Sequence, residues 1–286
     1  MTIDNDNRDD TPDRMDTTGG MDPSENETSW WTSTWPLHRA DWIAVAIALV
    51  SVIAVYVAVG ELLTNWSVLD GIVQTDKNVA QDLADGRTAT KTDLAHWSSF
   101  IADTPVKIAA SVVIAGLFLW RYRRWHEAVM IGLPLIFEAI AFIVTTYIVQ
   151  RPRPDVERLL ESPVDTSFPS GHVAAATVYA ALAIIVFWHT RAVWARSLAV
   201  AIAAIASLAV AWARAYQGMH FLSDVIAGVL LGLISIFICA QILGPPPGAV
   251  GGMSVNGANV NETTDEGTNV NVSGDTSQNR TREVRS

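Results

Sequence analysis

Apolar residues in the middle of the chain fall into six long runs separated by shorter polar connections. A transmembrane helix needs about 20 predominantly apolar residues to cross the hydrocarbon core of a bilayer. Each run reaches or approaches that length. The six runs are Asp41–Leu63, Thr104–Trp120, Ala128–Val149, Gly171–Phe187, Ala195–Trp212 and Phe221–Leu243. The pattern predicts an all-α protein, a polytopic membrane bundle of about six transmembrane helices.

Tryptophans mark many of the ends of these runs, as expected for a ring that prefers the membrane–water interface. They are Trp42, Trp66, Trp97, Trp120, Trp125, Trp188, Trp194 and Trp212. A soluble helical protein would not need so many apolar runs with aromatic ends. We therefore interpret the runs as membrane spans rather than as buried helices of a soluble domain.

The longest connection, residues 65–103, has its own apolar spacing. Its apolar positions recur with a partly helical period, which predicts one or two amphipathic helices. Two arrangements stay open. The helices lie on the membrane surface, or they form an ordered connection that packs on the bundle.

The two ends of the chain differ in composition from the middle. Residues 1–40 are acidic and rich in Ser, Thr and Asn, and residues 244–286 begin with a Gly-Pro-Pro-Pro-Gly sequence and have little contiguous apolar surface. Such segments bury too little apolar area to offset the entropy of ordering. We predict disordered tails at 1–40 and 244–286, and a membrane domain at 41–243.

Charge and cysteine content exclude some functions. The formal net charge is −10, and acidic residues crowd the first tail, so a single basic patch for a nucleic acid is not expected. The single cysteine, Cys239, lies in an apolar run, which excludes a disulfide within the chain and a cysteine metal cluster.

Arginines in the short connections predict the orientation of the bundle. The positive-inside rule places basic loops in the cytoplasm. The loops assigned to the cytoplasm carry Arg121, Arg123, Arg124, Arg191 and Arg196. Both tails are then cytoplasmic, and the connections after the first, third and fifth runs face outward. Those outward connections also hold arginines, namely Arg151, Arg153, Arg158 and Arg214. Arginines on the disfavoured side indicate a functional requirement.

Three polar clusters fall on this predicted outer face. The first is Arg151-Pro152-Arg153-Pro154, the second runs from Ser167 to His172, and the third comprises Arg214, His220 and Asp224. A guanidinium is a planar cation whose geometry suits phosphate oxygens. We expect Arg153 and Arg214, which come from different connections, to converge on one dianion.

The second cluster has the features of an anion site at a helix start. In Pro169-Ser170-Gly171-His172, Ser170 is a natural N-cap, and the first backbone N–H groups of a helix attract anions. Gly171 lets a phosphate approach the backbone closely. We therefore expect Ser170 and Gly171 to contribute to phosphate binding.

The third cluster pairs a histidine with a carboxylate. His220 and Asp224 are four residues apart, so they share a face if both are helical. Asp224 would then accept one imidazole N–H and leave the other ring nitrogen available for attack. Each cluster alone is common in proteins. The specificity lies in their joint occurrence, in this order, on one side of the bilayer.

The joint pattern resembles the type-2 phosphatidic acid phosphatase superfamily, over roughly residues 128–243. That family combines a lysine, six residues and Arg-Pro; then Pro-Ser-Gly-His; then Ser-Arg, five residues, His, three residues and Asp. The middle motif is intact here, and Arg153-Pro154, Arg214, His220 and Asp224 have the family spacing. Ala213 replaces the serine, and the lysine position falls on Thr146.

The missing lysine removes one phosphate contact that the family makes. The hydroxyl of Thr146 or Thr145 is one replacement, as a hydrogen-bond donor. Arg151 and Lys107, both predicted near the outer face, are the charged replacements. We favour Arg151, because Lys107 is more typical of a lysine that extends its amine to the interface.

The resemblance implies a membrane phosphatase that hydrolyses a lipid phosphate monoester or diphosphate without a metal or other cofactor. His220 would attack phosphorus, His172 would protonate the leaving oxygen, and a phosphohistidine would form and be hydrolysed. Arg153, Arg214, Ser170 and the Gly171 amide would hold the phosphoryl oxygens. The substrate in the bilayer would resemble phosphatidate, phosphatidylglycerol phosphate or undecaprenyl diphosphate.

Three alternatives stay open. A lipid phosphotransferase of the same superfamily would share the whole constellation. A non-enzymatic membrane protein with degenerated motifs is consistent with the loss of the lysine. A vanadate-dependent haloperoxidase shares the anion pocket, but the known enzymes of that kind are soluble, so we disfavour it.

Overall fold

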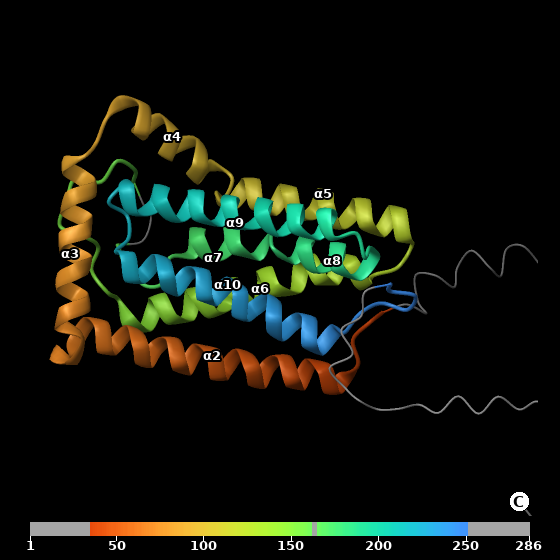
Figure 1. Cartoon of the computed structure of the whole chain (residues 1–286). Coiled ribbons are helices and arrows are strands. Elements are labelled where there is room, and N and C mark those ends of the chain that lie inside the picture. The colour runs from red at the N-terminus through yellow and green to blue at the C-terminus, as the bar shows by residue number, and fades with distance from the viewer. Residues whose placement is uncertain (1–34, 162–164, 251–286) are drawn as a thin grey trace, which may run out of the picture. The chain divides into compact units, whose positions relative to one another are not determined.

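The computed structural model describes residues 35–161 and 165–250, and the regular structure in these ranges is helical (Figure 1). The helices are α2 (Arg39–Asn65), α3 (Asp70–Asp85), α4 (Ala89–Phe100), α5 (Thr104–Tyr122), α6 (His126–Val149), α7 (Gly171–Val178), α8 (Ala181–His189), α9 (Val193–Tyr216) and α10 (Leu222–Leu243), with a short 3-10 turn at Ser67–Leu69. Within the described ranges the only β pairing is an isolated bridge between Pro152 and Thr166. The all-α prediction is confirmed.

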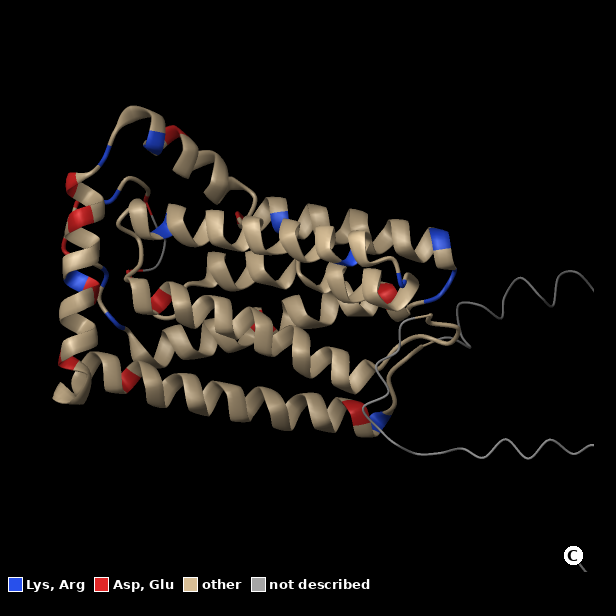
Figure 2. Ribbon diagram, viewed as in Figure 1, with Lys and Arg blue, Asp and Glu red and all other residues tan. Residues whose placement is uncertain are grey.

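Among the described residues, six helical segments are long and apolar enough to cross a membrane. They are α2, α5, α6, the pair α7–α8, α9 and α10, and each matches one predicted run to within a few residues at either end. The fourth span is broken between α7 and α8, at Tyr179 and Ala180, which the sequence pattern did not predict. The chain is therefore a multi-pass membrane protein. Charged residues lie mainly toward the two ends of the helices and are sparse between them (Figure 2).

Two glycines let α10 approach α7 closely. A Cβ atom added at Gly228 would lie 2.5 Å from the backbone oxygen of Ser170, and one at Gly232 would lie 2.6 Å from that of Ala174. Only a residue without a side chain fits at such a backbone contact. The contact holds the start of α10 beside the start of α7, where the Ser170 N–H donates to the Asp224 carbonyl (3.1 Å).

The long connection after α2 packs on one end of the bundle, with α3 across that end and α4 beside α9 (Figure 1). The Gln217 amide donates to the carbonyl of Ala95 in α4 (3.1 Å). Arg87, between α3 and α4, donates to the carbonyl of Tyr216 at 3.1 and 3.3 Å. Both helices of this connection, α3 and α4, pack on the bundle, as in the second of the two arrangements considered for residues 65–103.

Most of the two predicted tails lies outside the described residues. The described part of the second, residues 244–250, is fastened to the bundle. Its contacts include a bond from the Val250 N–H to the Trp188 carbonyl (2.9 Å) and one from Arg124 to the Pro247 carbonyl (2.9 Å).

Candidate active site

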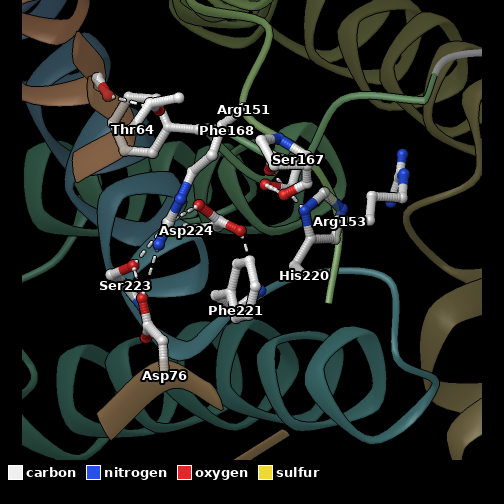
Figure 3. Close-up of polar contacts among 12 residues, drawn as sticks. Thr64, Asp76, Arg151, Arg153, Ser167, Phe168, His220, Phe221, Ser223 and Asp224 are labelled. Atoms are coloured by element: carbon white, nitrogen blue, oxygen red, sulfur yellow. Dashed lines mark hydrogen bonds and ion pairs between the residues drawn. The ribbon is translucent and has the colours of Figure 1, made fainter. Parts of the chain in front are cut away.

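The three sequence clusters meet at the end of the bundle that carries α3. Arg151 and Arg153 follow α6, Ser167 and Phe168 precede α7, and His220 lies in the turn between α9 and α10. Figure 3 shows these side chains beside one another, although they come from connections far apart in the sequence. The close approach of α7 and α10 holds two of these connections together.

His220 is buried, and one of its ring nitrogens is occupied. Its Nδ1 lies 2.7 Å from the carbonyl oxygen of Ser167, and the residue is 5% exposed. A carbonyl oxygen only accepts hydrogen bonds, so this contact places the ring proton on Nδ1 and leaves the lone pair on Nε2. Burial, together with the positive charges of Arg214 and Arg153, holds the pKa of His220 well below its usual value. At neutral pH, His220 is therefore a neutral imidazole suited to nucleophilic attack through Nε2.

The expected pairing of His220 with Asp224 is not the arrangement in the structure. The Asp224 carboxylate accepts from Arg151 Nη1 (2.6 Å) and from the backbone N–H of Phe221 (2.8 Å). The reason is local: α10 begins at Leu222, after an extended Phe221, so His220 precedes the helix. The four-residue spacing therefore does not place the two side chains on one helical face. The Ser167 carbonyl takes the orienting role that was predicted for Asp224.

Arg151 is also placed differently from the prediction. Its guanidinium is 2.9 Å from the Asp76 carboxylate and 2.6 Å from that of Asp224, and the residue is 2% exposed. It donates to the Ser223 hydroxyl (2.8 Å) and lies over the Phe221 ring, 4.6 Å from its centroid. Because two carboxylates satisfy this cation, it does not replace the missing lysine as a phosphate ligand. Its role is to join segments of the site.

Asp76 is the residue that sequence reasoning missed most clearly. It lies in α3, is 2% exposed, and accepts from the Ser223 backbone N–H (2.9 Å) and from the Ser223 hydroxyl as well as from Arg151. One signal was available. Asp76 lies four residues before Ala80, and these two are the buried residues of an otherwise more exposed helix. An acid on the buried face of an amphipathic helix indicates a buried cationic partner.

Arg153 and Arg214 supply the positive charge around His220. Arg153 is half-buried and donates to the Met219 carbonyl, one residue before His220. Arg214 is buried, with Nη1 3.3 Å from the Ser99 hydroxyl and 3.4 Å from the Gln217 amide oxygen. Its Nε is buried with no hydrogen-bond partner among the described residues. Both arginines act electrostatically on His220, as expected for cations near a shared anion site.

The helix start at Ser170 and Gly171 differs in detail from the expectation. The Ser170 hydroxyl does not cap α7, and its buried Oγ has no hydrogen-bond partner within the described residues. The absence of a side chain at Gly171 serves packing, because an added Cβ would lie 2.8 Å from the Phe142 ring. Thr146 donates to the Phe168 carbonyl (3.2 Å), so its hydroxyl ties α6 to the segment before α7.

His172, in the first turn of α7, has a carboxylate partner that the motifs do not contain. Its Nε2 lies 3.2 Å from Oδ1 of Asp103, which immediately precedes α5. Within the described ranges, no group of three or more His, Cys, Asp or Glu side chains is arranged to hold a metal ion.

A family model described as the PAP2 superfamily matches residues 127–245. This segment of the chain is therefore similar to the PAP2 superfamily. The matched segment contains the three clusters, and Asp76, Ser99 and Asp103 lie outside it. These three residues come from the connection between α2 and α5, so part of the site is built by a segment beyond the family match.

Curated relatives include two proteins with lipid-phosphatase names. The chain is 30% identical over 129 residues to phosphatidylglycerophosphatase B of Bacillus subtilis, a match that covers 44% of this chain and 63% of the relative. It is 29% identical over 160 residues to the putative undecaprenyl-diphosphatase YbjG of Escherichia coli, covering 53% of this chain and 76% of the relative. The match to the first of these relatives thus spans less than two thirds of its length.

A solved structure shares the fold. It is that of a transmembrane PAP2-type phosphatidylglycerolphosphate phosphatase from Bacillus subtilis, with a TM-score of 0.58 and 21% identity, and the match covers 68% of this chain and 94% of that one. The helical layout of that protein is therefore present here.

The role of Arg151 predicts how its removal acts. Arg151→Ala leaves Asp76 and Asp224 buried without their cation, so we expect the free energy of unfolding to fall by about 3–5 kcal/mol. The thermal unfolding midpoint of the purified protein in detergent measures this loss. Arg158→Ala is the control, because Arg158 pairs with Asp165 at an exposed position and should contribute less than about 1 kcal/mol. An unchanged midpoint with a raised KM would instead make Arg151 a phosphate ligand.

Proposed function

We propose that the protein is a membrane phosphatase that hydrolyses a lipid phosphate monoester or diphosphate through a phosphohistidine formed on His220. One observation carries the proposal: a buried, neutral imidazole is held by the Ser167 carbonyl at Nδ1 and is flanked by Arg153 and Arg214. This arrangement combines a nucleophile with two fixed cations for the charge on phosphoryl oxygens. The similarity of residues 127–245 to the PAP2 superfamily and the names of the relatives support it.

The reaction has two steps that share one acid–base residue. Nε2 of His220 attacks phosphorus, and the bond to the leaving oxygen breaks while His172 donates a proton to that oxygen. Water then attacks the phosphohistidine, gives a proton to His172, and the N–P bond breaks to release phosphate. Arg153, Arg214, the Ser170 hydroxyl and the first N–H groups of α7 hold the phosphoryl oxygens. No step uses a metal ion, and addition of EDTA should leave turnover intact.

Lipid access follows from the position of the site at the end of the spans. A headgroup reaches the arginines while its acyl or prenyl chains stay in the bilayer. By the positive-inside rule the connection between α5 and α6 and that between α8 and α9 are cytoplasmic, so the site and α3 face outward and both tails face the cytoplasm. An outward site favours a polyprenyl diphosphate over phosphatidate or phosphatidylglycerol phosphate, because a polyprenyl diphosphate is released on that face.

Phosphate release and trapping of the intermediate test this proposal together. We expect purified protein to release phosphate from at least one of phosphatidate, phosphatidylglycerol phosphate and undecaprenyl diphosphate, and His220→Ala to reduce the rate at least about 10³-fold, because nucleophile and intermediate are lost. Acid quenching destroys phosphohistidine and alkaline quenching preserves it. With a substrate that carries a radioactive phosphate, the wild-type protein should therefore keep its label after an alkaline quench and lose it after an acid quench. Activity retained by His220→Ala would rule out the covalent route. Release that requires an added alcohol acceptor would indicate a transferase.

The pH profile of kcat/KM tests the neutral state of His220. This parameter reports ionisations of the free enzyme, and attack requires the unprotonated ring. Because the pKa of His220 is lowered, activity should persist as pH falls through about 6.5, the ordinary histidine pKa, and decline only below it. Arg153→Gln removes a cation that lowers this pKa and should move the acid limb upward.

Two checks make that profile specific. Arg158→Gln, at an exposed position, should leave the acid limb in place. The substrate phosphate also ionises, with a pKa of about 6, so this pKa is measured separately and its effect is removed from the profile. An acid limb of the wild type at or above the ordinary histidine pKa would contradict a neutral nucleophile held between cations.

A further inference from the structure

Asp103 contacts one of the two histidines on which the proposed reaction depends, although no family motif includes it. Its Oδ1 lies 3.2 Å from Nε2 of His172, and its side chain is 45% exposed while that of His172 is 30% exposed. Asp103 lies between α4 and α5, before the segment that matches the family model. The contact therefore brings together a motif residue and a residue from outside the motifs.

Packing against α7 fixes the backbone around Asp103. Ala102 is fully buried and belongs to one apolar cluster with Val173 and Ala176 of α7. The Tyr179 hydroxyl donates to the Ile101 carbonyl (3.5 Å), and the Asp103 carbonyl accepts the Lys107 N–H of the first turn of α5 (2.9 Å). The segment that carries the Asp103 carboxylate is thus packed against α7, the helix that carries His172.

The two imidazoles of the site have partners of different charge. The Nδ1 of His220 faces a carbonyl and has cations around it, which favours a neutral ring. His172 faces a carboxylate, which accepts a hydrogen bond from its Nε2–H. The two rings are therefore held by different kinds of acceptor, a neutral carbonyl for His220 and a carboxylate for His172.

We propose that Asp103 is a positioning residue for His172, and this inference rests on the proposed function. Asp103 accepts the Nε2–H and so directs Nδ1, which has no hydrogen bond within the described residues, toward the leaving oxygen. In the first step the proton leaves Nδ1 for that oxygen, and the ring keeps its Nε2–H on Asp103. In the second step the Nδ1 lone pair accepts a proton from water as the hydroxyl oxygen bonds to phosphorus and the N–P bond breaks.

The dependence of the rate on the leaving group separates this role from a structural one. The alkoxide that leaves from a lipid phosphate monoester such as phosphatidate needs the proton, whereas the phenolate of p-nitrophenyl phosphate leaves without one, so a monoester is the lipid phosphate of this test. We expect Asp103→Asn to slow single-turnover phosphoenzyme formation from the lipid phosphate about 10–100-fold, as part of the contribution of general acid catalysis. The rate from p-nitrophenyl phosphate should change less than about twofold, and Asp103→Glu should restore part of the lipid rate.

Controls in the same series assign each outcome. Asp93→Asn changes an exposed acid of α4 and should leave both rates unchanged. An equal loss on both substrates would assign Asp103 a structural role and overturn the inference, and so would an unchanged lipid rate. A wild type that forms no phosphoenzyme, or a His220→Ala variant that forms as much, would instead overturn the proposed function itself.

Discussion

The buried guanidinium of Arg151, held between Asp76 and Asp224, is the interaction on which the arrangement of the site depends. It joins three parts of the chain that are distant in sequence: α3, the segment after α6 and the start of α10 (Figure 3). The backbone of Arg151 is also linked to the segment before α7, because the Ser167 N–H donates to the Arg151 carbonyl (2.8 Å). Ser167 in turn holds His220. Desolvating such an ion pair costs about as much as its attraction returns, so its contribution is to orientation more than to net stability.

This interaction also explains how one small region can hold carboxylates and cations and still bind the anionic substrate that we propose. Asp224 would repel a phosphate if its charge faced the substrate. Arg151 and the Phe221 N–H neutralise it instead, and its position on α10 fixes the turn that carries His220. The cations left around His220 are Arg153 and Arg214, which act on the ring and are placed to act on an anion. In the proposed mechanism, charge is thus divided between a structural network around Arg151 and the two arginines that would face the substrate.

The sequence predicted the membrane spans well, because the length and apolar character of a helix in a bilayer are local properties. The sequence also predicted that the motif residues lie at one end of the bundle, because loops that follow alternate spans lie on the same side. The break in the fourth span was not predicted, since Tyr179 and Ala180 sit within a continuous apolar run.

The errors concern contacts between distant segments. The spacing of His220 and Asp224 suggested one helical face, but the helix begins between them, and a shift of a helix end by two residues changes every contact of the residue before it. The prediction of Arg151 as a phosphate ligand rests on its charge and on its position near the motifs. Its partner Asp76 lies 75 residues earlier in the chain, where the motifs give no sign of it. The amphipathic pattern of α3 marks Asp76 as an acid on the buried face, but a long-range ion pair leaves no local pattern, so its partner Arg151 and the contact of Asp103 with His172 could be found only from the fold.

A structure of the protein with bound orthovanadate, an ion that adopts the five-coordinate geometry of a phosphoryl group in transfer, tests this account most directly. We predict that vanadium bonds to Nε2 of His220, that Arg153 and Arg214 contact its oxygens, and that Arg151 stays between Asp76 and Asp224. Vanadate bound away from His220, or Arg151 released from the two carboxylates to ligate it, would contradict the account.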